Sequence, residues 1–232
     1  MNKKSLLIIT VLVALILGTV AVVYTIVYKK AKLANELISA GKSQQPQNAE
    51  NPQNNSSGAV GGAKENKPSD RQLSPAYVLE KDKFSISIPV GWKDEYYPSV
   101  SAMVLNQADE LNDPAAMKDG FKSYFSVSHE DLRGHSREEY ANEVKKQIMG
   151  ISKDAIINNE KYGTINGHDS YSFESKLTRD GINFRVLLVF VKGDSDDIWT
   201  MSFNTTEVYW DSYKSIFTDT ANSFKIKSNA AG

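Results

Sequence analysis

Two of the three histidines in this chain lie in an acidic segment that could bind a metal ion. His129 precedes Glu130 and Asp131, and His135 follows shortly afterwards. A metal site usually needs ligands that converge at a fixed spacing, such as two histidines one turn apart on a helix. His129 and His135 instead flank a predicted connection between a strand and a helix. We interpret the segment as a solvated loop before a helix N-terminus, where the helix dipole favours acidic groups.

A second acidic loop contains Asp194, Asp196 and Asp197. It lacks the ligand spacing and the distal bidentate glutamate of a known calcium loop, so it indicates a solvated hairpin tip. The sequence therefore predicts no metal site. If one existed, the candidate ligands would be His129, His135, Asp194 and Asp196.

The sequence predicts no catalytic residue and no cofactor. His168 and Asp169 are adjacent after a predicted turn, but the chain has no Gly-x-Ser-x-Gly motif and no cysteine. Nucleophilic catalysis by an activated serine or a thiolate therefore has no recognisable motif. The lack of cysteine also excludes disulfide bonds and cysteine-bound metal clusters. Asn204 begins a glycosylation sequon, and we predict that it caps the last helix instead.

Two groups of aromatic residues have different patterns. Trp92, Trp199 and Trp210 fall in periodic positions and are predicted to lie in the core. Tyr96 and Tyr97 lie outside any periodic pattern. They form either a candidate recognition patch or a lid over one end of a sheet, and we favour the lid.

Charge is distributed unevenly along the chain. The first 71 residues carry nine lysines and arginines and four acidic residues, a net charge of +5. The remaining residues carry 18 basic and 24 acidic residues, a net charge of −6. A mildly acidic folded part lacks the electrostatic footprint for phosphate backbones, so no nucleic-acid partner is predicted.

The N-terminal segment is predicted to anchor the chain in a membrane. Residues 6–28 contain no charged side chain, and as a helix they would be about 34 Å long against a hydrocarbon core of about 30 Å. This apolar run is longer than that of a cleavable signal peptide, so we expect residues 1–30 to be an uncleaved signal anchor. Lysines flank the span on both sides and do not fix its orientation. We favour an extracytoplasmic C-terminal domain, because single N-terminal anchors commonly export the domain on their C-terminal side.

Residues 31–76 are predicted to connect the anchor to a folded domain. Residues 31–40 could extend the helix, and residues 41–76 then contain no aromatic residue and are rich in glutamine, asparagine, glycine, serine and proline. Such a composition cannot bury enough apolar surface to order the chain. A flexible linker of this length would have an r.m.s. span of about 30–35 Å.

The folded part is predicted to begin with a strand that ends abruptly. Apolar residues alternate with serines over Phe84–Ile88, as in a strand with one buried face. Pro89 cannot donate to a ladder and Gly91 permits a tight bend, so the chain turns and Trp92 closes the core. We predict an edge or near-edge strand that pairs with a short strand over Tyr77–Leu79.

Helix and hairpin signals come next along the chain. Ser136 and Glu139 form a capping box, and the helix that begins there has an apolar stripe that must face the sheet. The apolar stripe of this helix consists of Tyr140, Val144, Ile148 and Ile151. The dipeptides Asn166-Gly167 and Asp180-Gly181 suit two-residue hairpin turns. Further strands are predicted over Val100–Leu105, Phe121–Val127, Ile156–Ile165, His168–Leu177, Ile182–Val191 and Ile198–Phe203, with a helical turn near Ala115–Lys118.

A closing helix places several apolar residues on one face. These residues are Trp210, Tyr213, Phe217, Ala221 and Phe224. Together the elements occupy residues 77–228 and predict an α+β sandwich with helices packed on a sheet.

The order of these elements, together with two motifs, resembles the PsbP-like superfamily. The first motif is Phe-x-Ile-x-Ile-Pro-x-Gly-Trp over Phe84–Trp92. The second is Asn-Ser-Phe-Lys-Ile over Asn222–Ile226, at the C-terminal end of the last helix. This superfamily includes PsbP and DcrB-like proteins, and the resemblance is closest in character to its bacterial membrane-anchored members of unassigned function. The resemblance implies an αβα sandwich with a central, mostly antiparallel sheet and a non-enzymatic binding or assembly role.

The predicted function is therefore a membrane-anchored, extracytoplasmic binding or assembly module without a cofactor. Its predicted partner is a protein or a cell-envelope component. The alternative is a metal-dependent or hydrolytic cell-envelope enzyme that uses the region of His129 and His135.

Overall fold

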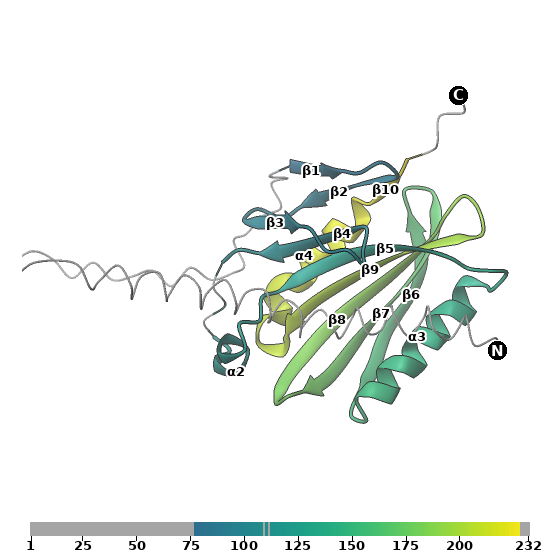
Figure 1. Ribbon diagram of the computed structural model, residues 1–232. Helices are drawn as coiled ribbons and strands as arrows, with labels where there is room; N and C mark the ends of the chain where they lie inside the picture. The colour runs from purple at the N-terminus through teal and green to yellow at the C-terminus, as the bar shows by residue number, and fades with distance from the viewer. Residues whose placement is uncertain (1–76, 109, 111, 228–232) are drawn as a thin grey trace, which may run out of the picture.

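The computed structural model describes residues 77–227, apart from residues 109 and 111 (Figure 1). In this part of the chain, no helix has the length and hydrophobicity needed to cross a bilayer. The following predicted segments lie outside the described residues: the signal anchor at 1–30 with its span at 6–28, the linker at 31–76, and residue 228.

Seven antiparallel strands form the main sheet, in the order β3-β4-β5-β9-β8-β7-β6. Their bounds are β3 (Trp92–Glu95), β4 (Ala102–Asn106), β5 (Tyr124–Asp131), β6 (Ile156–Ile165), β7 (His168–Arg179), β8 (Ile182–Lys192) and β9 (Asp197–Thr206). The apolar strand β8 lies between β9 and β7 with both faces covered, as its composition predicts. The strand β3 was not predicted, because its sequence after Trp92 is polar.

A second, smaller sheet contains β1 (Tyr77–Glu80), β2 (Phe84–Ile88) and β10 (Lys225–Ile226), with β2 in the middle. The predicted pairing of β1 with β2 is confirmed. Of the two predicted positions, edge and near-edge, β2 has the second: β10 returns from the C-terminal end of the domain to pair with its other side, so β2 is the middle strand of three. The turn after β2 sends the chain into the main sheet: Gly91 has a φ of +80°, and Trp92 donates its backbone N–H to the Pro89 carbonyl at 3.1 Å.

Helices cover both faces of the main sheet (Figure 1). Their bounds are α2 (Pro114–Lys118), α3 (Arg137–Ile151), the 3₁₀ turn η2 (Glu207–Tyr209) and α4 (Trp210–Asn222). The helix α3 packs on one face, and α4 together with the small sheet packs on the other. The domain is thus an antiparallel, sheet-rich α+β fold, in agreement with the sequence-based prediction.

Side-chain alternation divides the core between the two faces. Tyr124 faces the α3 side, while its neighbour Phe125 faces the α4 side together with Val127. All three tryptophans are buried on the α4 side, as predicted, with exposed fractions of 5% or less. The two faces therefore have separate apolar cores that share one sheet.

The local signals for α3 and the hairpins are confirmed, with one exception. The Ser136 hydroxyl accepts from the Glu139 N–H while the Glu139 carboxylate accepts from the Ser136 N–H, which completes the capping box. Asn166 and Asp180 have φ values of 48° and 52° in their turns. Ile151 was predicted to be buried and is 49% exposed, at the last residue of α3.

Candidate functional site

An open groove of about 220 Å³ lies between α4 and the strands β6, β7 and β8. Its floor is formed by strand residues on the α4 side of the sheet, and its walls by β6 and by one side of α4. Polar and apolar groups are mixed along it. The lining includes Asn159, Lys161, Gly163, Glu174, Lys214 and Thr218.

The β6–β7 turn closes one end of the groove. Asn166 adopts the left-handed conformation that its two-residue turn requires. Its side-chain amide then donates to the backbone carbonyls of Asn222 and Phe224, at 3.2 and 2.6 Å. These bonds attach the hairpin tip to the C-terminal end of α4 and fix the separation of the two walls there.

A charged network around Trp210 closes the other end. The carboxylate of Glu174 accepts from Arg185 and from Lys214, both at 2.9 Å. The guanidinium of Arg185 lies 4.6 Å and the ammonium of Lys214 lies 5.7 Å from the centre of the Trp210 ring. Glu207, in η2, adds contacts to Arg185 and to Lys176. The network links β7, β8, η2 and α4 at the point where α4 begins.

A β-bulge in β6 supplies a further contact to this network. The register of β6 on β7 shifts between Asn158 and Lys161, so Asn159 and Glu160 together lie opposite a single residue of β7, Phe173. Asn159 has a φ of 54° and its side chain hydrogen-bonds to Glu174 on the α4 side. Glu160 contacts Lys145 of α3 and the Tyr171 hydroxyl on the opposite side. The two adjacent residues of the bulge thus contact opposite faces of the sheet.

The ionisation of Glu174 is determined by these partners. Burial alone would raise the pKa of this carboxyl, since the residue is only 5% exposed. Hydrogen bonds from Lys214 and Asn159 and the contact with Arg185 outweigh burial and hold the pKa below its ordinary value. Glu174 is therefore an anion at neutral pH, and its negative charge is balanced by Arg185 and Lys214 within the network.

Lys161 differs from the other charged residues of the groove. It pairs in register with Ser172, while Gly163 pairs with Ser170, so all four residues belong to the α4 side of the sheet. The side chain of Lys161 is exposed and has no ion-pair partner among the described residues. A Cβ atom at Gly163 would lie 3.6 Å from the Ser170 hydroxyl, an ordinary contact, so the groove is open at this position.

The two histidines of the predicted metal segment do not converge. The Nε2 of His129 lies 2.8 Å from the Asp197 carboxylate, and its ring stacks on Trp199 with centroids 4.2 Å apart. The Nδ1 of His135 lies 3.9 Å from Glu139 within α3. Each imidazole therefore has a different carboxylate as its nearest charged partner.

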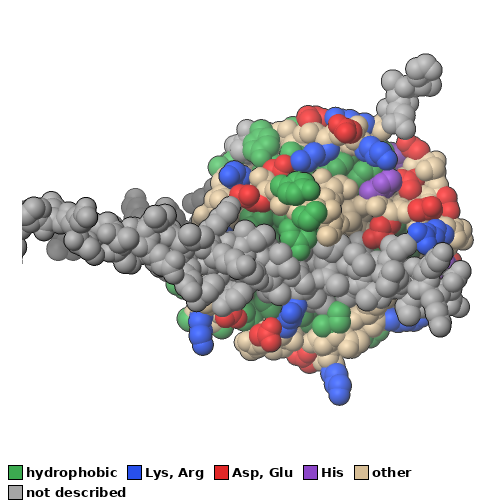
Figure 2. All heavy atoms as spheres, in the orientation of Figure 1, with side chains coloured by type: hydrophobic (Ala, Val, Ile, Leu, Met, Phe, Trp, Pro, Cys, Tyr) green, Lys and Arg blue, Asp and Glu red, His purple; other side chains and the backbone are tan. Residues whose placement is uncertain are grey.

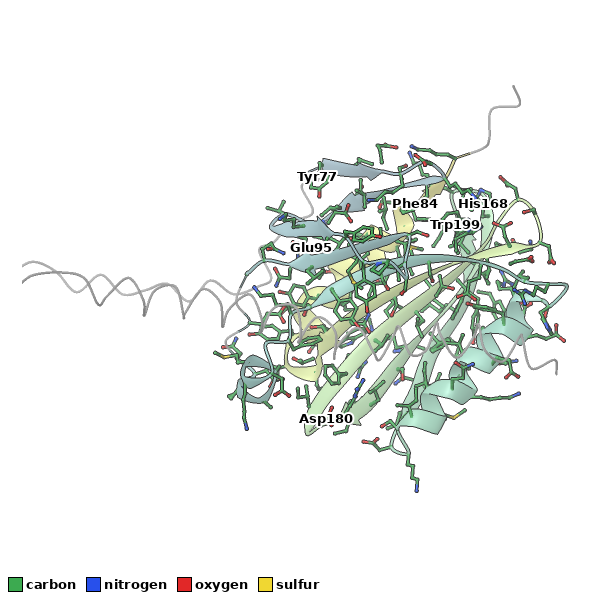
Figure 3. The ribbon with its side chains drawn as sticks, viewed as in Figure 1. Tyr77, Phe84, Glu95, His168, Asp180 and Trp199 are labelled. Carbon is green, nitrogen blue, oxygen red and sulfur yellow. The ribbon has the colours of Figure 1, made fainter. Side chains whose placement is uncertain are left out.

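The second acidic loop is also divided among separate partners. Asp194 lies 3.7 Å from His168, which is labelled in Figure 3 at the start of β7, whereas Asp169, the next residue in the chain, forms no ion pair with this histidine. Asp196 accepts from the backbone N–H of Gly134 at 2.7 Å. Among the described residues, no group of three or more histidines and carboxylates is arranged to hold a metal ion.

The two adjacent tyrosines lie in different environments. Tyr96 is 90% exposed, beyond the end of β3. Tyr97 is partly buried and packs against the core on the α3 side, and burial raises the pKa of its hydroxyl. Thus Tyr97 has the contacts of a lid, and Tyr96 alone has the exposure of a recognition residue.

The prediction that Asn204 caps the last helix is wrong. The strand β9 continues through Thr206, and Asn204 is 3% exposed within it. Its amide donates to the carbonyl and hydroxyl oxygens of Ser202. The chain reaches α4 only after η2, so Asn204 lies too early to cap it.

Surface charge on the domain is interspersed. Figure 2 shows acidic and basic side chains mixed over the visible face, without a continuous basic stripe among the described residues. A nucleic-acid interface usually has such a stripe, so this face offers no support for one. The absence of a nucleic-acid partner stays a prediction from the net charge.

Comparison with known proteins identifies the domain. The PsbP family model matches residues 74–226. The chain belongs to the PsbP family. No curated protein matches it.

Several solved structures resemble the PsbP domain. Cyanobacterial PsbP (CyanoP) from Synechocystis sp. PCC 6803 has 19% identity and a TM-score of 0.46, over 65% of this chain and 91% of CyanoP. LpqN of Mycobacterium tuberculosis, described as involved in cell envelope biogenesis, has 7% identity and a TM-score of 0.49, over 65% and 90%. The Saccharomyces cerevisiae Ran-binding protein Mog1p has 10% identity and a TM-score of 0.49, over 65% and 94%.

The residues that form the groove of this PsbP domain were not predicted from the sequence. Lys161, Glu174 and Lys214 come from three separate elements, and each resembles an ordinary surface charge in its own segment. One signal was present: Asn158 and Asn159 interrupt a strand in which such residues are disfavoured, and an interruption of this kind is typical of a bulge.

Proposed function

We propose that the PsbP domain is a non-enzymatic binding module, held near a membrane, whose groove beside α4 binds a protein or cell-envelope partner. The observation that carries the proposal is the groove itself. Both of its ends are fixed, by Asn166 and by the Glu174 network, while the space between them stays open. A preformed concave surface with a few convergent polar groups is the usual form of a binding site.

The polar groups in the groove favour binding over catalysis. The charge of Glu174 is satisfied by Arg185 and Lys214, so this carboxylate is not poised to accept a proton at neutral pH. The alternative enzyme centred on His129 and His135 receives no support from their geometry, since each contacts a different carboxylate.

The N-terminal segment completes the proposal. A span at residues 6–28 and a linker at 31–76, flexible over residues 41–76, would hold the domain near a bilayer, because that flexible part has an r.m.s. span of about 30–35 Å. We place the domain on the extracytoplasmic side, where an envelope component or the exposed part of a membrane protein is within reach. Protease treatment of intact cells should degrade the domain, and protection until the cells are lysed would contradict this orientation.

Site-specific photocrosslinking in cells that naturally produce the protein tests the binding function. A photoreactive residue at Thr218, in the groove, is expected to give one discrete adduct with an identifiable partner. The matched control is Lys146, an exposed position on α3 at the opposite face. Gly163→Leu fills the groove and should remove the Thr218 adduct.

Three outcomes distinguish the sites. Equal adducts from Thr218 and Lys146, or an adduct that survives Gly163→Leu, would contradict binding in the groove. An adduct formed only from a photoreactive residue at Tyr96 would move the site to the exposed tyrosine. No specific adduct at any position would contradict the binding module as a whole.

A further inference from the structure

The outer wall of the groove is the edge strand β6. The strand β6 is the last strand of the main sheet and pairs only with β7 within the described residues. It is ten residues long, and nearly all of its residues are exposed or partly exposed. The strand at the other end of the sheet, β3, has four residues. An edge of this length presents unpaired backbone groups that can accept another strand.

The regular part of that edge begins after the bulge. From Lys161 to Ile165 the register on β7 is uninterrupted, whereas Asn159 and Glu160 break it. An added strand would therefore pair along Lys161–Ile165, and its length would be set by the bulge at one end and the Asn166 turn at the other. Its side chains would point alternately toward the groove and toward the α3 side.

The charged side chains of the groove indicate which side chains an added strand would carry. Its charged lining consists of Lys161, Lys214 and Glu174, and Glu174 is already paired with Lys214 and Arg185. Lys161 is left as a cation without an ion-pair partner among the described residues. An acidic side chain on the groove side of an added strand would supply the missing partner.

The α3 side of the same edge offers an aromatic surface. Tyr162 is 67% exposed, and its ring lies 4.9 Å from that of Tyr171, with the guanidinium of Arg137 5.6 Å from its centre. A small or apolar side chain from an added strand would pack beside this ring. The two sides of the edge thus favour an alternating pattern of acidic and non-acidic residues.

A second copy of this chain fits the edge poorly. Antiparallel pairing of β6 with itself over Lys161–Ile165 would place Lys161 opposite Ile165 of the second copy and would give neither lysine an acidic cross-strand partner. The bulge and the lysine also protect the edge against self-association in the way common to natural edge strands.

We infer that the partner, under the proposed binding function on which this inference rests, presents an extended acidic peptide segment that adds to β6 along Lys161–Ile165. Backbone hydrogen bonds to β6 provide the main attachment, and acidic side chains in the groove contact Lys161.

The test uses the full chain in detergent micelles and a soluble peptide of alternating glutamate and threonine that spans Lys161–Ile165. Binding is measured by fluorescence anisotropy of the labelled peptide, and the site by hydrogen exchange followed with mass spectrometry. The peptide should slow exchange in β6 and leave exchange in β3 unchanged. Lys161→Glu should weaken binding about tenfold, and Lys161→Arg should retain it.

The matched control is Lys146→Glu, which makes the same charge change at an exposed position on α3 and should leave affinity within about twofold. Equal weakening by Lys146→Glu, or full binding by Lys161→Glu, would overturn the inference. So would equal affinity for a peptide with lysine in place of glutamate. Concentration-dependent protection of β6 without peptide would instead identify a second copy as the occupant.

The two proposals fail separately. If the Thr218 crosslink is found and is lost with Gly163→Leu, while the acidic peptide does not bind, the binding function stands and the acidic-strand inference is overturned.

Discussion

Glu130 shows how a single residue links the fold to pH. It lies in β5 beside α3, where burial raises the pKa of its carboxyl to about 7, despite opposing effects of the Tyr140 hydroxyl and the Arg133 charge. The folded state therefore binds a proton more tightly at this position than the unfolded chain does. The stability that this proton contributes is present at low pH and is lost as the pH rises toward and through 7.

Glu130→Gln is expected to remove this loss. The difference in free energy of unfolding between the variant and the unmodified protein should shift in favour of the variant by about 2 kcal/mol when the pH is raised from 5 to 8. Urea unfolding followed by tryptophan fluorescence at both pH values measures it. Glu95→Gln, at a side chain that is 41% exposed, serves as the control and should change stability by less than about 0.5 kcal/mol. A constant effect of Glu130→Gln at both pH values would contradict the assignment.

At the scale of elements, the two hairpin turns look alike in sequence but differ in their tertiary contacts. Asn166 and Asp180 both precede glycine and both have positive φ. Asn166 also donates hydrogen bonds to backbone carbonyls at the C-terminal end of α4. Asp180 is exposed at the far end of β7 and forms an ion pair with its neighbour Arg179 (Figure 3). The first turn therefore positions the groove, and the second only connects two strands.

Substitution by glycine separates these roles, because glycine keeps the turn conformation and removes the side chain. Asn166→Gly should cost about 1 kcal/mol through the lost hydrogen bonds and should speed hydrogen exchange at the β6–β7 turn. Asp180→Gly is the matched control and should leave stability within about 0.5 kcal/mol. If both variants behaved alike, the bonds from Asn166 to α4 would not contribute to stability.

At the scale of the whole molecule, the two sheets are joined through one aromatic cluster. Phe224 is 1% exposed, and its ring lies 5.6 Å from Phe84 of the small sheet and 5.5 Å from Trp199 of the main sheet. The backbone N–H of Ser87 in β2 also donates to the Ser223 hydroxyl at the end of α4. The small sheet, α4 and the main sheet should therefore unfold as one unit.

Phe224→Ala tests this coupling. Loss of the ring should reduce the free energy of unfolding by about 3–5 kcal/mol, since its contacts span both sheets. Hydrogen exchange should then accelerate together in β2 and β9. Val208→Ala, at a residue that is 55% exposed, is the control and should have little effect. Faster exchange in β2 alone would show that the small sheet opens independently.

Much of the fold was predictable because its signals are local. The capping box at Ser136, the two turns before glycine and the apolar strand β8 depend on neighbours within a few residues. The family motif over Phe84–Trp92 also predicted a strand, a turn and a buried tryptophan. What it did not reveal was the second partner of β2, because β10 is two residues long and lies at the other end of the domain.

The groove was not predictable either, because its residues come from segments that lie far apart in the sequence. The sequence by itself determined most of the elements, most of their buried faces and the family motif, since these follow from periodicity, turn chemistry and capping. Only the tertiary structure decided that Glu174 is paired from β8 and α4, and that Lys161 has no ion-pair partner in the described part of the chain. Charge pairing depends on which distant segments meet, and that is fixed by packing of the whole sheet against α4.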